Sequence, residues 1–315
     1  MLGITLPAFA KVNLRLDIIG RRADGFHELR TIFQTISLHD TLRLEWIRGG
    51  AIELEITGNA ALASESPRTN LVYRALAAMR AELGIARGVR ARLEKRIPAG
   101  RGLGGGSSDA AAALVGLLRL APRRIPLARL VEIASELGSD VPFFLFGGRA
   151  AALGRGEQLL PLPDGPARGV LVISPRSISV ATRDAYSWLV LPRARKRAAR
   201  SARGAVLRLT NPRVASRLIE FCALCWSPQE APLSNDFERA VFKRHPLLGR
   251  IKRELLQRGA EDAALAGSGS AVFGVFRNPA QARRAAHWFP NEEVFVCSTV
   301  TRKQVRRALG EPVAV

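Results

Sequence analysis

Cysteine is scarce in this chain, with three residues among 315. Cys222, Cys225 and Cys297 are too few for the disulfide framework that holds small secreted domains together. Cys222 and Cys225 have the spacing of a metal or redox pair, but no second pair and no nearby histidine accompanies them. We therefore interpret these two as small apolar residues of a buried helix, and we expect a cytoplasmic protein.

Long apolar segments are absent as well. No stretch reaches the roughly 18 apolar residues that a membrane-spanning helix requires. The first residues do not combine a basic segment with an apolar core, as a secretory signal does, so no membrane partner is expected. With 47% apolar residues the chain can still bury a large core. We expect two domains, residues 1–165 and 166–315, divided at the Pro- and Gly-rich segment 161–166.

Lysine is nearly missing, since only six of the 48 basic residues are lysines. The net charge of +21 is typical of a nucleic-acid-binding protein, but the preference for arginine is also typical of a genome-wide composition bias. The densest basic run, residues 193–208, has seven basic residues, no acid and no aromatic residue that could stack on a base. We interpret it as a solvated linker or helix face, and we do not expect a nucleic-acid partner.

Glycine, in contrast, is concentrated at one place, with five glycines between Gly100 and Gly106. Ser107, Ser108 and Asp109 follow, and then an alanine-rich apolar run typical of a buried helix. Such a loop lets the backbone approach a ligand closely, and the helix N-terminus offers unpaired N–H groups to an anion. The segment therefore predicts a binding site for a polyphosphate.

The segment does not match two common types of phosphate-binding loop. A Walker loop needs a lysine, and none lies between Arg96 and Asp109. The spacing of Gly100, Gly102 and Gly105 matches a dinucleotide loop, which should follow a buried parallel strand and precede an acid by about 20 residues. Residues 89–95 instead alternate apolar and charged side chains, and residues 119–125 contain no acid.

The pattern Pro-x-x-x-Gly-Leu-Gly-x-Gly-Ser-Ser at 98–108 closely resembles the loop of the galactokinase, homoserine kinase, mevalonate kinase and phosphomevalonate kinase (GHMP) superfamily. Four further segments resemble the 4-diphosphocytidyl-2-C-methyl-D-erythritol kinases of that superfamily, namely residues 7–14, 22–29, 137–142 and 266–271. The resemblance implies a two-domain α+β fold with the active site in the inter-domain cleft and ATP bound mainly by residues 1–165. It also implies transfer of the ATP γ-phosphoryl group, with Mg²⁺, to the 2-hydroxyl of that substrate for isoprenoid precursor synthesis.

The resemblance further implies that Lys11 and Asp140 are the catalytic pair. A carboxylate can accept the proton of the attacked hydroxyl, and an ammonium can keep it ionised and neutralise the transferring group. Lys11 is the only lysine among the first 94 residues of a chain that otherwise uses arginine, which indicates that this position requires a compact ammonium and not a planar guanidinium. The structural alternatives are an exposed strand lysine and a helix N-cap ahead of Pro142.

The remaining site residues also come from the resemblance, and none of them is predicted as a metal ligand. The predicted ATP-binding residues are Lys95, Pro98, Ala99, Gly100, Arg101, Gly102, Leu103, Gly104, Gly105, Gly106, Ser107 and Ser108. Ser108 is expected near Mg²⁺ or the β-phosphate, whereas Arg101 either contacts a phosphate or faces solvent. The predicted substrate-binding residues are Asn13, Phe26, His27, Thr182, Tyr186, Gly267 and Ser268.

The substrate residues have a chemical rationale. A histidine can read the donor–acceptor edge of cytosine while aromatic rings stack on its faces. His27 could instead be an ordinary loop histidine, and Gly267 part of an ordinary hairpin turn. Two rival functions follow: another small-molecule kinase, such as a homoserine or mevalonate kinase, and a basic nucleic-acid-binding protein. The Gly25-Phe26-His27 segment argues against the first, and the glycine loop against the second.

The periodicity of the chain supports an α+β fold, because strands and helices cluster rather than alternate. Residues 8–18 alternate apolar and polar side chains and predict a strand with Lys11 and Asn13 on its polar face. Further strands are predicted at 29–37, 41–47, 52–57, 89–95, 169–173 and, around a turn, 264–276. Helices are predicted at 69–83, 108–120, 127–137, 182–189, 213–226, 247–258, 279–288 and 301–308.

Overall fold

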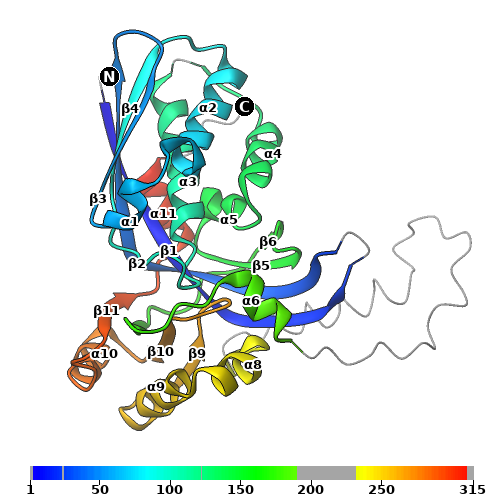
Figure 1. Ribbon diagram of the computed structural model, residues 1–315, viewed down its shortest axis with the longest axis vertical. Coiled ribbons are helices and arrows are strands. Elements are labelled where there is room, and N and C mark those ends of the chain that lie inside the picture. The colour runs from blue at the N-terminus through cyan, green and yellow to red at the C-terminus, as the bar shows by residue number, and fades with distance from the viewer. Residues whose placement is uncertain (1–2, 23–24, 122, 190–231, 311–315) are drawn as a thin grey trace, which may run out of the picture.

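The computed structural model describes residues 3–22, 25–121, 123–189 and 232–310 (Figure 1). Its strands are β1 (Gly3–Arg21), β2 (His27–Ile47), β3 (Ile52–Thr57), β4 (Gly88–Glu94), β5 (Arg149–Gly154), β6 (Gln158–Pro161), β7 (Gly169–Ser174), β8 (Ser234–Asn235), β9 (Asp262–Leu265), β10 (Val272–Phe276) and β11 (Glu293–Ser298). Its helices are α1 (Ala60–Ser64), a 3₁₀ turn η1 (Pro67–Thr69), α2 (Leu71–Leu83), α3 (Gly105–Leu120), α4 (Leu127–Leu137), α5 (Val141–Phe146), α6 (Thr182–Ser187), α8 (Phe237–Arg244), α9 (Pro246–Gln257), α10 (Pro279–Ala286) and α11 (Arg302–Leu309).

The larger sheet is organised around the long antiparallel pair β1 and β2. Its order is β3-β4-β2-β1-β8, and β5 also pairs with β2 and carries β6 at its other edge. The pairing of β1 with β2 slips at three irregularities, between Phe9 and Lys11, between Asn13 and Arg15, and between Ile18 and Gly20. Such irregularities re-aim side chains next to functional sites. Two of the three flank Lys11 and Asn13.

Helices α2, α3, α4, α5 and α11 cover one face of the upper part of this sheet (Figure 1). The core between them is rich in alanine and leucine, and α3 is buried on nearly all sides. Helix α11 follows the second sheet in sequence, yet it places Val305 and Leu309 in this first core. The end of the chain therefore packs against the larger sheet again. The division into residues 1–165 and 166–315 stays a prediction.

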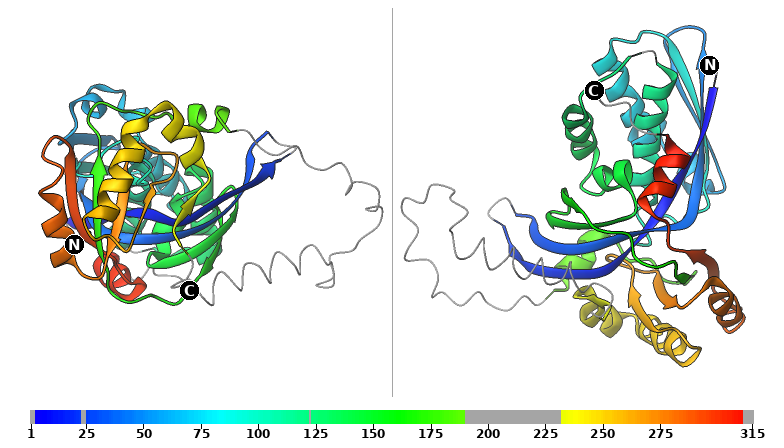
Figure 2. Two further views of the ribbon diagram at one scale, coloured as in Figure 1. Left: turned by 90° about the horizontal axis from the view of Figure 1, so that it is seen from below. Right: turned by 180° about the vertical axis from the view of Figure 1, so that it is seen from behind.

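The smaller sheet has the order β11-β7-β10-β9, and its strand β7 is buried on both faces. Alternate residues separate the two faces: Leu171 and Ile173 pack with helices α8, α9 and α10, which lie on the outer side (Figure 2). Val170 and Val172 pack instead with Ala10 and Val12 of β1 and with Leu103 of the glycine loop. Apolar contact thus joins the second sheet directly to the elements that carry the predicted site.

The α+β prediction is confirmed, and most predicted elements are present. The segments 29–37 and 41–47 form one continuous strand, β2, because pairing with β1 continues through His39 and Asp40 between them. Strands β5, β6, β8 and β11, helices α1, α5 and α8 and the turn η1 were not predicted. The basic run 193–208, the helix 213–226 and Cys222 and Cys225 lie outside the described residues. No helix in the described ranges is long and apolar enough to cross a membrane.

Candidate active site

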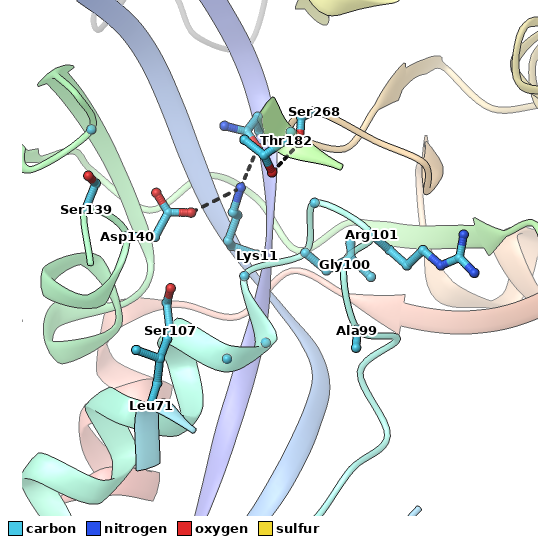
Figure 3. A pocket seen from close by; sticks show the side chains of 18 of the residues that line it. Lys11, Leu71, Ala99, Gly100, Arg101, Ser107, Ser139, Asp140, Thr182 and Ser268 are labelled. Atoms are coloured by element: carbon cyan, nitrogen blue, oxygen red, sulfur yellow. Dashed lines mark hydrogen bonds and ion pairs between the residues drawn. The ribbon is translucent and has the colours of Figure 1, made fainter. Parts of the chain in front are cut away.

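A cleft of about 830 Å³ opens where the glycine loop, strands β1 and β2, helix α6 and the turn after β9 meet. Of the residues predicted for the site, all except Ser108 line it. Figure 3 shows Lys11 near the centre of this cleft, with Asp140 on one side and Thr182 and Ser268 on another. Segments far apart in sequence therefore meet around one space, as the predicted inter-domain site requires.

Lys11 and Asp140 form an ion pair in the cleft, with Lys11 Nζ 3.6 Å from Asp140 Oδ2. The Lys11 side chain is 5% exposed and that of Asp140 31% exposed. Burial lowers the pKa of Lys11, while the charge of Asp140 opposes that shift. The alternative of an exposed strand lysine is therefore wrong.

The polar neighbours of Lys11 hold its ammonium in place. Lys11 Nζ donates to Asn13 Oδ1 at 2.8 Å, and Asn13 Nδ2 donates in turn to Thr31 Oγ1 at 2.8 Å. The ammonium also lies 5.1 Å from the centre of the Phe33 ring. Thr31 and Phe33, both on β2, were not among the predicted site residues. The sequence around Thr31 and Phe33 could not have identified them as site residues, because the pairing of β2 with β1 is known only from the structure.

Asp140 occupies the N-cap position of α5, but its side chain caps no backbone N–H. An aspartate that served only as a cap would accept from the first turn of the helix. Here the carboxylate is left available to Lys11 and to the cleft. The geometry therefore supports a chemical role for Asp140 over the capping alternative.

The glycine loop has the backbone conformation that its composition predicts. Gly100, Gly102 and Gly104 have positive φ angles of 67°, 81° and 74°. A Cβ on Gly104 would lie 2.7 Å from the Phe144 ring and 3.2 Å from Lys11 Cε, so only glycine fits there. Beyond it, the N-terminus of the 16-residue helix α3 opens toward the cleft with Ser107 on its first turn. This arrangement is suited to the phosphate groups of a nucleotide.

Ser108 is the predicted residue that the structure does not bring to the cleft. It is 2% exposed and lines a separate small cavity with Phe9 and Phe144. Successive residues of a helix point about 100° apart, so Ser107 and Ser108 point in different directions. The hydroxyl that faces the cleft belongs to Ser107.

Lys95 lies beneath the loop, in a buried cluster with Asp40 and Asp109 that was not predicted. Lys95 Nζ is 2.7 Å from Asp109 Oδ2 and also contacts Asp40 Oδ2. A Cβ on Gly105 would lie 3.3 Å from Lys95 Nζ, which puts the cluster directly under the first turn of α3. Burial opposes the charge on Lys95, but the two carboxylates outweigh it and raise its pKa. The ammonium is therefore already paired within the protein.

The two carboxylates of this cluster differ in their surroundings. Asp40 Oδ1 accepts from the backbone N–H groups of Arg96 at 2.5 Å and Ile97 at 2.8 Å. Asp109 Oδ1 is buried without a partner. Burial, opposed by Lys95 and reinforced by Asp40, raises the pKa of Asp109 to about 8. At neutral pH the proton therefore belongs on Asp109.

An aromatic group also lines the cleft. The His27 and Tyr186 rings stack with their centres 4.6 Å apart, and Tyr186 meets Phe237 edge to face at 4.9 Å. Burial and the charge of Arg21 lower the pKa of His27, so its ring is neutral at pH 7. A neutral imidazole has one donor and one acceptor nitrogen. Phe26 is 54% exposed, and its ring lies 5.0 Å from the Arg155 guanidinium.

The turn after β9 closes the cleft from the second sheet. Thr182 Oγ1 and Ser268 Oγ are 3.1 Å apart, which links α6 to this turn. Asn235 supports the turn from below, because its Nδ2 donates to the carbonyls of Leu265 at 2.8 Å and Gly267 at 2.7 Å. Asn235 was not predicted, since it follows the segment 190–231 and carries no recognisable motif.

A further wall of the cleft was also missed. It lies beyond the glycine loop and is formed by Leu62, Glu65, Thr69, Asn70 and Leu71. These residues lie in α1, at its C-cap Glu65, in η1 and at the start of α2, where Asn70 caps the helix by accepting from the Val72 N–H at 2.8 Å.

Comparisons with known proteins agree with the geometry. The family profile described as GHMP kinases N terminal domain matches residues 70–148, and that described as GHMP kinases C terminal matches residues 218–292. A curated 4-diphosphocytidyl-2-C-methyl-D-erythritol kinase from Solibacter usitatus is 43% identical over 97% of this chain and 93% of its own length. One from Geobacter sulfurreducens is 38% identical over 95% of this chain and 99% of its own length.

Solved structures show the same relationship. The crystal structure of a 4-(cytidine 5′-diphospho)-2C-methyl-D-erythritol kinase has a TM-score of 0.74 and 35% identity, covering 94% of this chain and 99% of the other. A homoserine kinase from Cytophaga hutchinsonii has a TM-score of 0.68 at 18% identity, covering 96% and 95%, which shows the shared fold alone. The chain therefore belongs to the 4-diphosphocytidyl-2-C-methyl-D-erythritol kinases of the GHMP kinase superfamily.

Proposed function

We propose that this kinase transfers the γ-phosphoryl group of ATP to the 2-hydroxyl of 4-diphosphocytidyl-2-C-methyl-D-erythritol in isoprenoid precursor synthesis, and that it does so in the cytoplasm. The observation that carries the proposal is the Lys11–Asp140 pair, which lies in one cleft with the glycine loop and the His27–Tyr186 stack. A phosphate donor and a nucleotide-bearing acceptor could therefore meet at this pair.

In the proposed reaction, Asp140 accepts the proton of the 2-hydroxyl as its oxygen attacks the γ-phosphorus. The bond between that phosphorus and the bridging oxygen breaks, and ADP leaves. Lys11 offsets negative charge on the transferring group, and its own position is held by Asn13. Positioning and charge stabilisation are the main contributions that a protein makes to phosphoryl transfer. The 3.6 Å separation of the pair is compatible with this role, since catalytic contacts tighten when substrates bind.

ATP fits the glycine loop, where Gly100 has open space in place of a Cβ and the first turn of α3 presents its N–H groups. Mg²⁺ would enter with ATP, held largely by the phosphates and water, as is usual for kinases. Among the described residues no group of three or more His, Cys, Asp or Glu side chains is arranged to hold a metal ion. The carboxylate of Asp140 and the hydroxyl of Ser107 are among the oxygen-bearing side chains that line the cleft.

A substrate panel tests this proposal. Formation of ADP is measured with the cytidine substrate, with its uridine counterpart, with homoserine and with mevalonate, and the products are identified by mass and phosphorus NMR. We expect turnover with the cytidine substrate and one new phosphate monoester on its 2-oxygen. Turnover with homoserine or mevalonate instead would contradict the proposal.

His27 should be needed for the cytidine group and not for ATP. His27→Ala leaves the cytosine edge without a partner and should weaken binding of the cytidine substrate by ~1–3 kcal/mol, seen as a raised KM, with KM for ATP unchanged. Since the pKa of His27 is lowered from 6.5, binding should be constant from pH 7 upward and change only at lower pH. The exposed His287, which follows α10 as its C-cap, provides a control, His287→Ala. An unchanged KM for the cytidine substrate would remove His27 from the site.

A further inference from the structure

Arg101 is the long charged side chain of the glycine loop, and the structure gives it a partner that neither sequence alternative included. Its Nη1 donates to Ser270 Oγ at 2.6 Å. Ser270 is fully buried, and its hydroxyl donates to the carbonyl of Ile178 at 2.7 Å. Figure 3 shows the Arg101 side chain directed away from Lys11 and Asp140. Arg101 therefore joins the glycine loop to the turn that carries Gly267 and Ser268.

Backbone contacts reinforce this junction. The Ala271 N–H donates to the Arg101 carbonyl at 3.3 Å. A Cβ on Gly102 would lie 1.9 Å from the Ala266 carbonyl oxygen, and one on Gly267 would lie 3.0 Å from the Gly102 oxygen. The two loops thus touch through their main chains, which leaves no room for a side chain between them.

The same loop also contacts the catalytic lysine. The Lys11 N–H donates to the Leu103 carbonyl at 3.0 Å, two residues beyond Arg101. Gly104 lies close against the Lys11 side chain, as its Cβ position shows. Any displacement of residues 101–104 would therefore move a hydrogen-bond partner of Lys11 together with the predicted phosphate site.

We propose that Arg101 is a positioning residue for phosphoryl transfer, acting through its hydrogen bond to Ser270. This bond holds the glycine loop against the turn 267–271, so that the donor phosphate and the acceptor hydroxyl meet at the Lys11–Asp140 pair. A loop with three positive-φ glycines has little stiffness of its own, and a 1 Å misplacement of reacting groups costs roughly 100-fold in rate. The proposal rests on the proposed function.

A double-mutant cycle tests it. Arg101→Gln, Ser270→Ala and the double variant are compared for kcat and for KM of both substrates, with Arg250→Gln on the exposed face of α9 as the control. Each single change should lower kcat by about 10-fold or more, because a hydrogen bond to a charged group is lost, with KM for ATP changed by less than about threefold. The double variant should be no worse than the worse single variant. Arg101→Lys, which keeps a charged donor, should recover part of the loss.

Two results would overturn the proposal. One is a raised KM for ATP in Arg101→Gln with wild-type kinetics in Ser270→Ala, which would mean that Arg101 binds a phosphate directly. The other is full additivity of the two changes. The same cycle is measured in the free energy of unfolding, which needs no substrate and also reports whether Ser270→Ala folds. If the effects of the two changes on the free energy of unfolding are additive, the hydrogen bond between Arg101 and Ser270 is contradicted. If the wild type shows no turnover in the substrate panel, only the proposed function is contradicted.

Discussion

Asp140→Asn should lower kcat by ~10²–10⁴, with the affinity for ATP close to that of the wild type. Asparagine keeps the shape of the side chain but cannot accept the hydroxyl proton. Because Asp140 makes no capping hydrogen bond, the change should not disturb α5. Turnover is measured with the cytidine substrate, and ATP binding by calorimetry. Asp184→Asn, a half-exposed aspartate of α6, is the matched control.

Lys11 supplies the second arm of this experiment. Lys11→Met keeps the buried stem and removes the charge, so we expect a loss of kcat of similar order through lost charge stabilisation. Since the two residues lie 3.6 Å apart and act together, the double variant should be little worse than either single one. If Asp140→Asn turns over within a few-fold of the wild type, the turn before α5 is structural and the proposed base is wrong.

Lys95→Met should lower the free energy of unfolding by about 3–5 kcal/mol, the usual cost of removing one partner from a buried ion pair. The Lys95 side chain is 4% exposed, and its loss leaves Asp40 and Asp109 buried together without a cation. The cluster lies under the first turn of α3, so ATP binding should weaken as well. Chemical denaturation gives the free energy of unfolding. The control is Lys252→Met, because the Lys252 side chain also pairs with a carboxylate, Glu238, but is 23% exposed.

Asp109 allows the charge state of this cluster to be tested by pH. Its folded pKa of about 8 exceeds its ordinary value of 3.8, so the folded state binds a proton that the unfolded chain releases. This stabilisation is complete below about pH 4 and is lost as the pH rises to about 8. Asp109→Asn, which mimics the protonated acid, should remove that part of the pH dependence. A variant and wild type with parallel stability curves from pH 5 to 9 would show that Asp109 is ionised throughout.

The glycine loop, the turn ahead of Asp140 and the segment containing His27 could be predicted because their chemistry is local. Runs of glycine set the backbone freedom of the loop, and the alanine-rich sequence after it sets a buried helix. Alternation over residues 8–18 predicted the strand that presents Lys11 and Asn13. The resemblance, carried by short contiguous segments, added the superfamily, the fold and the pairing of Lys11 with Asp140.

The partners of these residues depended on which surfaces met after folding. Lys95 was predicted to bind ATP but pairs with Asp40 and Asp109, and Arg101 pairs with Ser270. Ser108 turns from the cleft because the helix geometry of α3 points its side chain toward Phe9 and Phe144. Composition and periodicity act over a few residues and so determined the elements and the kind of chemistry. Pairing between distant segments follows from burial and strand register, and only the tertiary structure could decide it.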